Sequence, residues 1–452
     1  IYPGPNKRMG RSSYANGGSR LKELQLPDYA GYGVKVPAPG ASDALGTQVL
    51  GTYLRDVFRL SAKDRNFRLF CPDETSSNKL QNVFDATLRA FELPIIPTDE
   101  FLAPDGRVME ILSEHCCEGW LEGYLLTGRH GVFACYEAFI SIVDSMMAQY
   151  AKWSKMAREI PWRVPVASLN YLLTSHIWEQ DHNGYSHQGP TFINMLLTKK
   201  ASMTRVYLPP DTNCLLSVTD HALRSRGHIN LIVASKKAIP QWLDPAAARE
   251  HCERGASIWG WASNDEGSPD VVMAAAGDVP TRETLAAVWW LRHEVPDLRV
   301  RVVNVVDLLS LDSRGDHPHG MDETAFRELF TNGTDVVFAF HGYPGVIHEL
   351  VYRRPNPTRF HVRGYMEEGT TTTPFDMTVL NHMSRYDLAI AALQRASRLR
   401  SKVADAIQTF QRKLVEHHAY IIANGRDSPE ILDWRWDRAV PPDPAAAMTG
   451  PR

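Results

Sequence analysis

The stretch VASLNYLLTSHIWEQDHNGYSHQGP, residues 166–190, carries the pattern that decides the fold. Residues 166–177 are an apolar, β-favouring run that predicts a buried strand. The chain then turns through Asn183-Gly184 and reaches Pro190, after which apolar residues recur at helical spacing. Open α/β sheets bind ligands just outside the carboxyl ends of their strands. Imidazole, amide, carboxylate and hydroxyl side chains crowd into residues 178–190, so we take them as the candidate active-site loop.

Strands and helices are predicted to alternate on both sides of this loop. In the first part of the chain we expect strands at 67–70, 204–208 and 229–235, and helices at 44–57, 140–153 and 213–224. The alternation restarts later, with strands at 271–276, 299–308, 335–340 and 360–365, helices between them and a long helix at 374–397. Such alternation is typical of parallel sheets covered by helices. The predicted fold class is therefore α/β, with two parallel-sheet domains.

Composition predicts where the domains begin and end. Residues 1–46 are rich in Pro, Gly, Ser and Asn and show no sustained period, which predicts an extended surface connector. The polar run SNDEGS at 263–268 marks a boundary, so the first domain is expected at 47–262 and a smaller second domain at 263–440. The Pro/Ala-rich residues 441–452 are predicted to be a disordered tail.

The overall composition argues against several classes of protein. Net charge is −3 and no basic block stands out, which argues against nucleic acid as the main partner. No apolar run reaches the about 20 residues of a membrane span, and no leader opens the chain, so neither a membrane protein nor a secreted one is expected. The six cysteines lack CxxC spacing, which indicates reduced thiols in a cytoplasmic protein. The chain begins at Ile1 inside a linker-like segment, which suggests a fragment of a longer protein.

Several predicted strand ends carry groups that suit phosphate. Residues 75–78 follow the strand at 67–70 and predict a helix N-terminus, where free N–H groups favour an anion. Ser77 and Lys79 lie there, and Lys236 follows the strand at 229–235. Together with His182 and His187 these donors and cations suit a multiply charged ligand. Residue chemistry thus predicts an α/β protein that binds a phosphorylated small molecule.

Two motifs have simpler explanations than a cofactor site. The turn at Gly277-Asp278 lacks the spacing of a phosphate-binding loop and is best explained as a plain strand–helix turn. The histidines near Asp181 match no metal motif, so no metal ligands are predicted. No GxSxG or SxxK pattern occurs, which argues against serine acyl chemistry.

Glu114 and the aromatic residues after it also have simple interpretations. A glutamate near a helix end is more often solvated than catalytic. Phe133, Tyr136 and Phe139 are more often core side chains than a stacking wall. Lys236, as an isolated lysine, is by default solvent-exposed.

A series of long motifs in one order gives a sharper prediction. They are PDETSSN (72–78), SEHCCEGW (113–120), LTGRHG (126–131), QDHNGYSH (180–187), AAGDVPT (275–281), VNVVDL (303–308) and GTTTTPFDM (369–377). On these motifs the sequence resembles phosphoketolase, a thiamine-diphosphate enzyme related to transketolase. The resemblance runs from the connector near residue 8 to about Trp434.

The resemblance implies which parts of that enzyme this chain contains. The family has three domains, and the chain is similar to the last two: a pyrimidine-binding domain at 47–262 and a transketolase-like C-terminal domain at 263–440. The first domain, which holds the diphosphate and Mg²⁺, is not matched, and no GDG…N metal motif occurs. The resemblance therefore implies thiamine diphosphate and Mg²⁺ as cofactors, both completed by a domain outside this chain.

The resemblance also implies roles for individual residues. Glu114 would hydrogen-bond the aminopyrimidine ring and so activate the cofactor, with Glu118 as the nearby competitor. Phe133 and Tyr136 would wall the ring. The substrate and phosphate channel would be lined by Ser77, Lys79, Gln180, His182, Asn183, His187 and Lys236, with His182 and His187 also in catalytic roles. The family often has Arg at the position of Lys79, and lysine lacks the bidentate fork.

The implied activity is that of an aldehyde-lyase. Xylulose 5-phosphate or fructose 6-phosphate would be cleaved with inorganic phosphate to acetyl phosphate and an aldose phosphate. Because the superfamily completes its cofactor site between subunits, a homodimer or larger homo-oligomer is implied. Two alternatives remain: a transketolase that transfers the two-carbon unit to an aldose, and a non-catalytic subunit without the diphosphate-binding domain.

Overall fold

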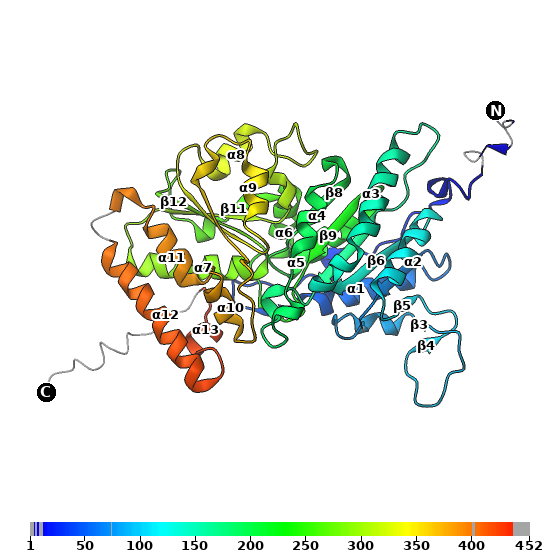
Figure 1. Cartoon of the computed structure of the whole chain (residues 1–452), viewed down its shortest axis with the longest axis horizontal. Coiled ribbons are helices and arrows are strands. Elements are labelled where there is room, and N and C mark those ends of the chain that lie inside the picture. Colours follow the sequence, from blue (N-terminus) through cyan, green and yellow to red (C-terminus); the bar gives the residue numbers. More distant parts are fainter. Residues whose placement is uncertain (1–3, 5–6, 9–11, 74, 400–402, 437–452) are drawn as a thin grey trace.

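The computed structural model describes residues 4, 7–8, 12–73, 75–399 and 403–436 (Figure 1). Its larger sheet has the strand order β4-β3-β5-β2-β6-β7-β9-β8, and every pair is parallel. The strands are β2 (Phe67–Cys71), β3 (Arg89–Ala90), β4 (Leu102–Ala103), β5 (Val108–Glu110), β6 (His130–Tyr136), β7 (Leu169–Thr174), β8 (Thr204–Tyr207) and β9 (Ile229–Val233).

The smaller sheet has the order β11-β13-β12-β14-β15. Its strands are β11 (Ala256–Ile258), β12 (Val271–Ala276), β13 (Val300–Val305), β14 (Val336–Phe340) and β15 (Phe360–Arg363). Four of the strands are parallel, whereas β11 pairs antiparallel with β13. The predicted α/β class is confirmed, with one antiparallel edge strand that the sequence pattern did not indicate. Because β11 lies before residue 263, the second sheet begins earlier than the predicted boundary.

Helices cover both faces of the larger sheet. Along β6, Val132 and Ala134 pack with α1 (Gly46–Leu60) and α5 (Thr212–Arg224), whereas Phe133 and Cys135 pack with α2 (Glu114–Leu126) and α3 (Asp144–Arg158). Every residue of β7 and β9 is buried. Parallel strands covered on both faces become continuous apolar runs, which is why residues 166–177 show little alternation.

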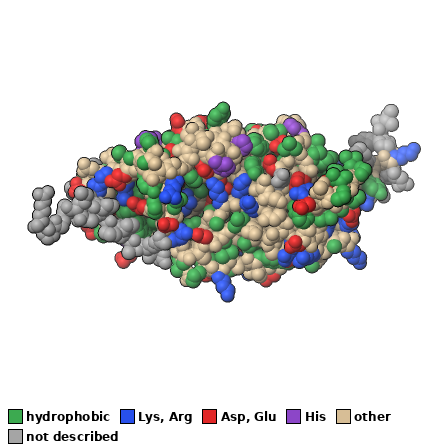
Figure 2. All heavy atoms as spheres, turned by 90° about the horizontal axis from the view of Figure 1, so that it is seen from below, with side chains coloured by type: hydrophobic (Ala, Val, Ile, Leu, Met, Phe, Trp, Pro, Cys, Tyr) green, Lys and Arg blue, Asp and Glu red, His purple; other side chains and the backbone are tan. Residues whose placement is uncertain are grey.

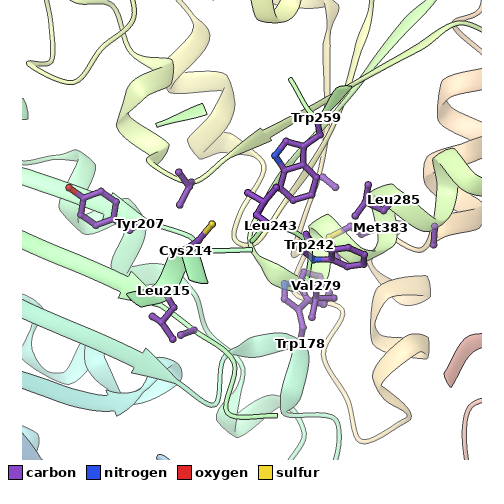
Figure 3. Packing of buried hydrophobic residues seen from close by; sticks show 14 of the residues in the cluster. Trp178, Tyr207, Cys214, Leu215, Trp242, Leu243, Trp259, Val279, Leu285 and Met383 are labelled. Atoms are coloured by element: carbon purple, nitrogen blue, oxygen red, sulfur yellow. The ribbon is translucent and has the colours of Figure 1, made fainter. Parts of the chain in front are cut away.

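The second sheet is covered in the same way. Its alternate side chains meet α7 (Asp278–Glu294), α11 (Arg385–Leu393) and α12 (Ala404–Asn424) on one face, and α8 (Glu323–Phe330) and α9 (Gly345–Val351) on the other. The apolar cores of the two sheets are continuous. Figure 3 shows Trp178 and Trp242 of the first domain beside Val279 and Leu285 of α7.

Three predicted helices differ from the structure. Residues 75–79 form a turn before the short 3-10 helix η5 (Gln81–Asp85), because the side chain of Asn78 turns inward and donates to Cys71 Sγ at 3.1 Å. The helix expected at 140–153 is a 3-10 helix, η6 (Glu137–Val143), followed by α3. The long helix expected at 374–397 is split into α10 (Pro374–Leu380) and α11, because His382 has φ = 52° and Ser384 caps a new helix start.

The remaining expectations concern the two ends of the chain. The described part of the connector contains two 3-10 turns, η3 (Gly17–Arg20) and η4 (Tyr29–Tyr32), and ends in β1 (Asp43–Leu45), which pairs with β10 (Ala238–Pro240). The predicted tail, 441–452, lies outside the described residues. Among the described helices, none combines the length and the apolar character that crossing a membrane requires.

Candidate functional site

The candidate site lies where four parallel strands of the larger sheet end. The turn at 75–79 follows β2, Tyr136 ends β6, the loop 175–190 follows β7, and Lys236 comes after β9. Since β2, β6, β7 and β9 are neighbours in one parallel sheet, their carboxyl ends share one edge. This is the edge at which α/β sheets bind ligands.

Lys236, two aromatic rings and His187 make contact along this edge. The Nζ of Lys236 donates to Tyr136 Oη at 2.9 Å and lies 4.1 Å from the centre of the tyrosine ring. Tyr136 stacks with Phe139 at 6.2 Å between ring centres, and Phe139 meets the ring of His187 edge-on at 5.1 Å. The structure therefore brings together three predicted site residues, and Phe139 joins them through its contact with His187.

Asp73 lies among these groups. Burial raises the pKa of the Asp73 carboxyl, and Glu114 raises that pKa further, whereas a hydrogen bond from the Tyr136 backbone and the charges of Lys236 and His187 oppose the rise. Its Oδ2 is buried and has no hydrogen-bond partner among the described residues. A buried acceptor without a partner is costly unless a ligand satisfies it. Sequence reasoning placed Asp73 at a strand end and within a motif but gave it no role, although an acidic residue just after a strand was a usable signal.

Glu114 and its competitor Glu118 lie in different surroundings. Glu114 is the first residue of α2 and is partly exposed, and Ser113 caps the helix by accepting from Cys116 N–H. Glu118 lies one turn further on, fully buried, where its Oε1 accepts from Tyr171 Oη at 2.6 Å. Burial, with the neighbouring Glu122, raises the pKa of Glu118 to about 8. Geometry favours Glu114 as the carboxylate that reaches the strand-end edge.

The loop after β7 is braced by its own amides. Gln180 is buried, donates through Nε2 to Ser175 O at 3.0 Å and accepts from Asn183 Nδ2 at 2.8 Å. Gln188 Nε2 donates to Gln180 O at 2.9 Å. His182 is exposed on this loop, with its Nδ1 3.9 Å from Asp181 Oδ1.

Three other predicted site residues lie apart from the contacts around Lys236. Ser77 and Lys79 are partly buried on the turn after β2, and Lys79 has a left-handed φ of 61°. The intervening Asn78 bonds to Thr174 at the end of β7, which holds the turn at the same edge. Phe133 is fully buried, and its ring packs 5.9 Å from that of Tyr171, within the core that faces α2.

Four buried titratable residues, two histidines and two carboxylic acids, join this edge to the second domain, and sequence reasoning assigned none of them. His176 Nε2 lies 2.8 Å from Asp278 Oδ2, and His341 Nε2 lies 2.7 Å from Glu137 Oε1. Burial lowers the pKa of His176, but Asp278, with Glu179 and Glu137, raises it to about 9. The sequence signal for two of them was their position, because Asp278 lies two residues after the end of β12 and His341 directly follows β14.

The edge suits a flat, nitrogen-containing ring together with an anion. Glu114 supplies a carboxylate at a helix start, Tyr136 and Phe139 supply stacked rings, and Lys236 supplies a cation. The unpartnered oxygen of Asp73 leaves an acceptor for a donor group of a ligand.

Known protein families and individual relatives match this sequence along most of its length. Residues 48–225 match the family model described as D-xylulose 5-phosphate/D-fructose 6-phosphate phosphoketolase, and residues 236–436 match the XFP C-terminal domain. A probable phosphoketolase of Rhodopseudomonas palustris (strain HaA2) is 60% identical over 96% of this chain and 56% of the relative. One from Nitrosomonas europaea is 58% identical over 96% of this chain and 55% of the relative. The chain thus spans about half the length of the curated relatives it matches.

Solved structures share the fold. A transketolase of Pichia stipitis in complex with sedoheptulose 7-phosphate matches with a TM-score of 0.61 and 14% identity, over 84% of this chain and 49% of the other. A transketolase from Leishmania mexicana has a TM-score of 0.59 and 15% identity, over 84% and 49%. A split-gene transketolase described as an inactive β4 tetramer has a TM-score of 0.50 and 15% identity, over 79% of this chain and 99% of that one. These likenesses confirm the transketolase-like arrangement of the two domains.

Proposed function

The chain belongs to the phosphoketolase family, and from that premise we propose that it forms the part of a phosphoketolase that activates the cofactor and binds the sugar phosphate. The complete protein cleaves xylulose 5-phosphate, fructose 6-phosphate or both with inorganic phosphate. The products are acetyl phosphate, water, and glyceraldehyde 3-phosphate or erythrose 4-phosphate. This reaction makes the protein an aldehyde-lyase.

The single observation that carries this proposal is the convergence around Asp73. The charges of Glu114, Lys236 and His187 act on one half-buried carboxyl, although these residues come from α2 and from the segments after β7 and β9. The family relationship implies thiamine diphosphate as the cofactor. Mg²⁺ and the diphosphate-binding domain are assigned to the part of the protein outside this chain, which spans about half the length of its relatives.

The residues present fit the pyrimidine ring of this cofactor. When bound, thiamine diphosphate supplies a carbon nucleophile that adds to the ketose carbonyl and stabilises the charge left when the carbon–carbon bond breaks. Glu114, the partly exposed carboxylate of the pair, would share a proton with a nitrogen of the pyrimidine ring through a hydrogen bond. Tyr136 and Phe139, which stack on each other, would pack against the ring face and exclude water from it. Phe133 supports this wall from the core behind it.

Lys236 and His187 act on the substrate side of the edge. Lys236 is held over Tyr136 and offers its charge to a phosphate or to a developing oxyanion. His187, in contact with Phe139, is placed to hold or move a proton on a substrate hydroxyl. Ser77, Lys79, Gln180, Asn183 and His182 complete the channel, with Gln180 fixing the loop and the exposed His182 nearest to solvent.

A partner surface is part of the proposal. Apolar side chains gather at the right-hand end of the molecule in Figure 2, the end that contains the larger sheet. Exposed apolar residues of this domain include Leu93, Ile96 and Leu112, the last of which directly precedes the cap of α2. Large exposed apolar patches mark interaction sites. The diphosphate-binding domain and a second subunit cover this end in a homodimer or larger oligomer.

The six cysteines are unpaired, which supports a cytoplasmic location.

The test uses the intact parent protein with xylulose 5-phosphate, thiamine diphosphate and Mg²⁺, with and without inorganic phosphate. Acetyl phosphate is trapped as its hydroxamate. Product that depends on phosphate is the expected result. Transfer of a two-carbon unit to an added aldose, without acetyl phosphate, would instead identify a transketolase.

One observation favours a second candidate, a chain that is inactive by itself. The split-gene transketolase named as an inactive tetramer is matched over 99% of its own length, by 79% of this chain. A two-domain chain of this kind can therefore exist as a separate polypeptide. Activity that appears only after a second polypeptide is added would support this candidate.

A further inference from the structure

Two histidine–carboxylate pairs cross between the domains directly behind the site. His341, after β14, contacts Glu137 at 2.7 Å, and both side chains are 1% exposed. His176, after β7, contacts Asp278 at 2.8 Å, with side-chain exposures of 0% and 4%. The two imidazole rings lie 5.1 Å apart and nearly perpendicular. Each pair therefore joins one strand end of the larger sheet to one strand end of the smaller sheet.

Glu137 connects three segments of the site. It begins η6, directly after Tyr136 and two residues before Phe139. Its Oε1 pairs with His341, while its Oε2 accepts from Ile177 N–H at 2.8 Å, at the start of the loop that carries Gln180 and His187. One buried carboxylate thus holds the aromatic wall, the substrate loop and the second domain in register.

The second domain also holds the beginning of that loop. Asp278 is the first residue of α7 and follows Gly277, whose φ of 109° admits no side chain without strain. Trp178 Nε1 donates to His341 O at 3.0 Å, so the backbone of the second domain contacts the loop as well. Residues 176–178 are therefore fixed by Asp278 and His341 before the loop reaches Gln180.

We propose that His341 and Asp278 are positioning residues, through which the second domain sets the geometry of Tyr136, Phe139 and His187. The proposal rests on the proposed function and extends it, because it assigns the C-terminal domain a part in the site without substrate contact. A catalytic arrangement loses about 100-fold in rate when a group is misplaced by about 1 Å. Rigid, buried hydrogen-bonded pairs such as these can hold catalytic groups in position.

A buried cation is the competing explanation for the same residues. Ligand atoms of His176, Asp278 and His341 lie within 4.8 Å of one another. The Nε2 atom of each histidine, however, is already hydrogen-bonded to a carboxylate. Two histidine–carboxylate hydrogen bonds account for the geometry without an ion.

The test compares His341→Ala with His341→Gln in the full-length protein, because glutamine retains a donor near the position of Nε2. His361→Gln is the matched control, since His361 Nε2 pairs with Asp335 at 2.7 Å in the same domain, outside the site. Val337→Ala, a buried change on β14, controls for lost stability. The measurements are the dissociation constant of thiamine diphosphate by fluorescence quenching, kcat and KM for both substrates, Tm, and metal content.

We expect His341→Ala to lower kcat/KM by about 100-fold and to weaken thiamine diphosphate binding, and His341→Gln to restore most of both. In His361→Gln, kcat/KM and the dissociation constant of thiamine diphosphate should both stay within about twofold of the wild-type values. Equal losses in Val337→Ala at a matched Tm would overturn the proposal, as would a stoichiometric metal that is lost with His341. If His341→Ala does not fold, His341→Asn, whose amide is too short to reach Glu137, replaces it.

The same experiment separates this proposal from the proposed function. A wild-type protein that makes no acetyl phosphate would contradict the phosphoketolase assignment. The cofactor dissociation constants of the variants would still test whether His341 positions the ring-binding wall. Unchanged dissociation constants and unchanged kcat/KM in His341→Ala would overturn the positioning role, whatever reaction the protein catalyses.

Discussion

The ammonium group of Lys236 lies 4.1 Å above the ring of Tyr136 and donates a 2.9 Å hydrogen bond to its hydroxyl. A lysine held over an aromatic face is less free than an exposed one, and its charge has a fixed position. The tyrosine is in turn stacked on Phe139. The cation of the candidate site is thus fixed by the same rings that we assign to the wall of the cofactor.

Replacing Lys236 with methionine should lower kcat/KM for the ketose phosphate by about 10- to 100-fold, because a charge-assisted hydrogen bond is lost. Steady-state kinetics of acetyl phosphate formation measure this change. Lys63→Met, on an exposed position of the same domain, is the control and should leave the kinetics unchanged. Equal activity in the two variants would remove Lys236 from the site.

Glu114→Gln and Glu118→Gln form a matched pair on one helix. Loss of the proton-carrying carboxylate in Glu114→Gln should reduce acetyl phosphate formation by at least about 100-fold with little change in Tm. Burial raises the pKa of Glu118 to about 8 and so favours its neutral form, which glutamine imitates. Its variant should keep near-normal turnover. A reversed result would transfer the catalytic role to Glu118.

Glu118 should also make stability depend on pH. Its folded pKa of about 8 lies above the ordinary 4.5, so the folded state binds the proton more tightly than the unfolded state. The stabilisation is therefore complete below pH 4.5 and is lost as the pH rises toward 8. We expect the Tm of the wild type to fall across this range relative to that of Glu118→Gln. Parallel curves would show that Glu118 titrates normally.

Phe133 and Phe139 should respond differently to truncation. Phe133 is fully buried, and its replacement by alanine should cost about 3–5 kcal/mol of unfolding free energy, measured by urea denaturation. Phe139 contacts both Tyr136 and His187, so Phe139→Ala should lower kcat/KM with a smaller loss of stability. If Phe133→Ala loses activity at unchanged stability, Phe133 contacts the cofactor directly.

Sequence reasoning predicted most of the fold because buried parallel strands are nearly continuous apolar runs. The strands around residues 204–208, 229–235 and 271–276 lie within two residues of their predicted limits. The turn at 75–79 was predicted as a helix because its capping residues are also turn residues. The turn is set by the buried hydrogen bond from Asn78 to Cys71, a tertiary contact that cannot be predicted from the local sequence pattern.

Site residues could be predicted from the sequence where a polar residue lies close after the end of a predicted strand. Lys236 lies just beyond the end of β9 and His187 lies in the loop after β7, and the structure brings them to one edge. The pair between Glu137 and His341 joins residues 204 positions apart, so it depends on how two sheets are packed. Phe133 was grouped with Tyr136 through the family resemblance, whereas its place on β6 buries it in the core that faces α2.

The continuous apolar core has an evolutionary consequence. Trp178, Trp242 and Trp259 pack where the two sheets meet, beside Val279 and Leu285 (Figure 3). If the gene were split between the parts that encode the two sheets, these indole side chains would be exposed to solvent on the two resulting polypeptides. The two sheets are therefore expected to be inherited together, as an inseparable genetic module, even in lineages where a different part of the enzyme is encoded by another gene.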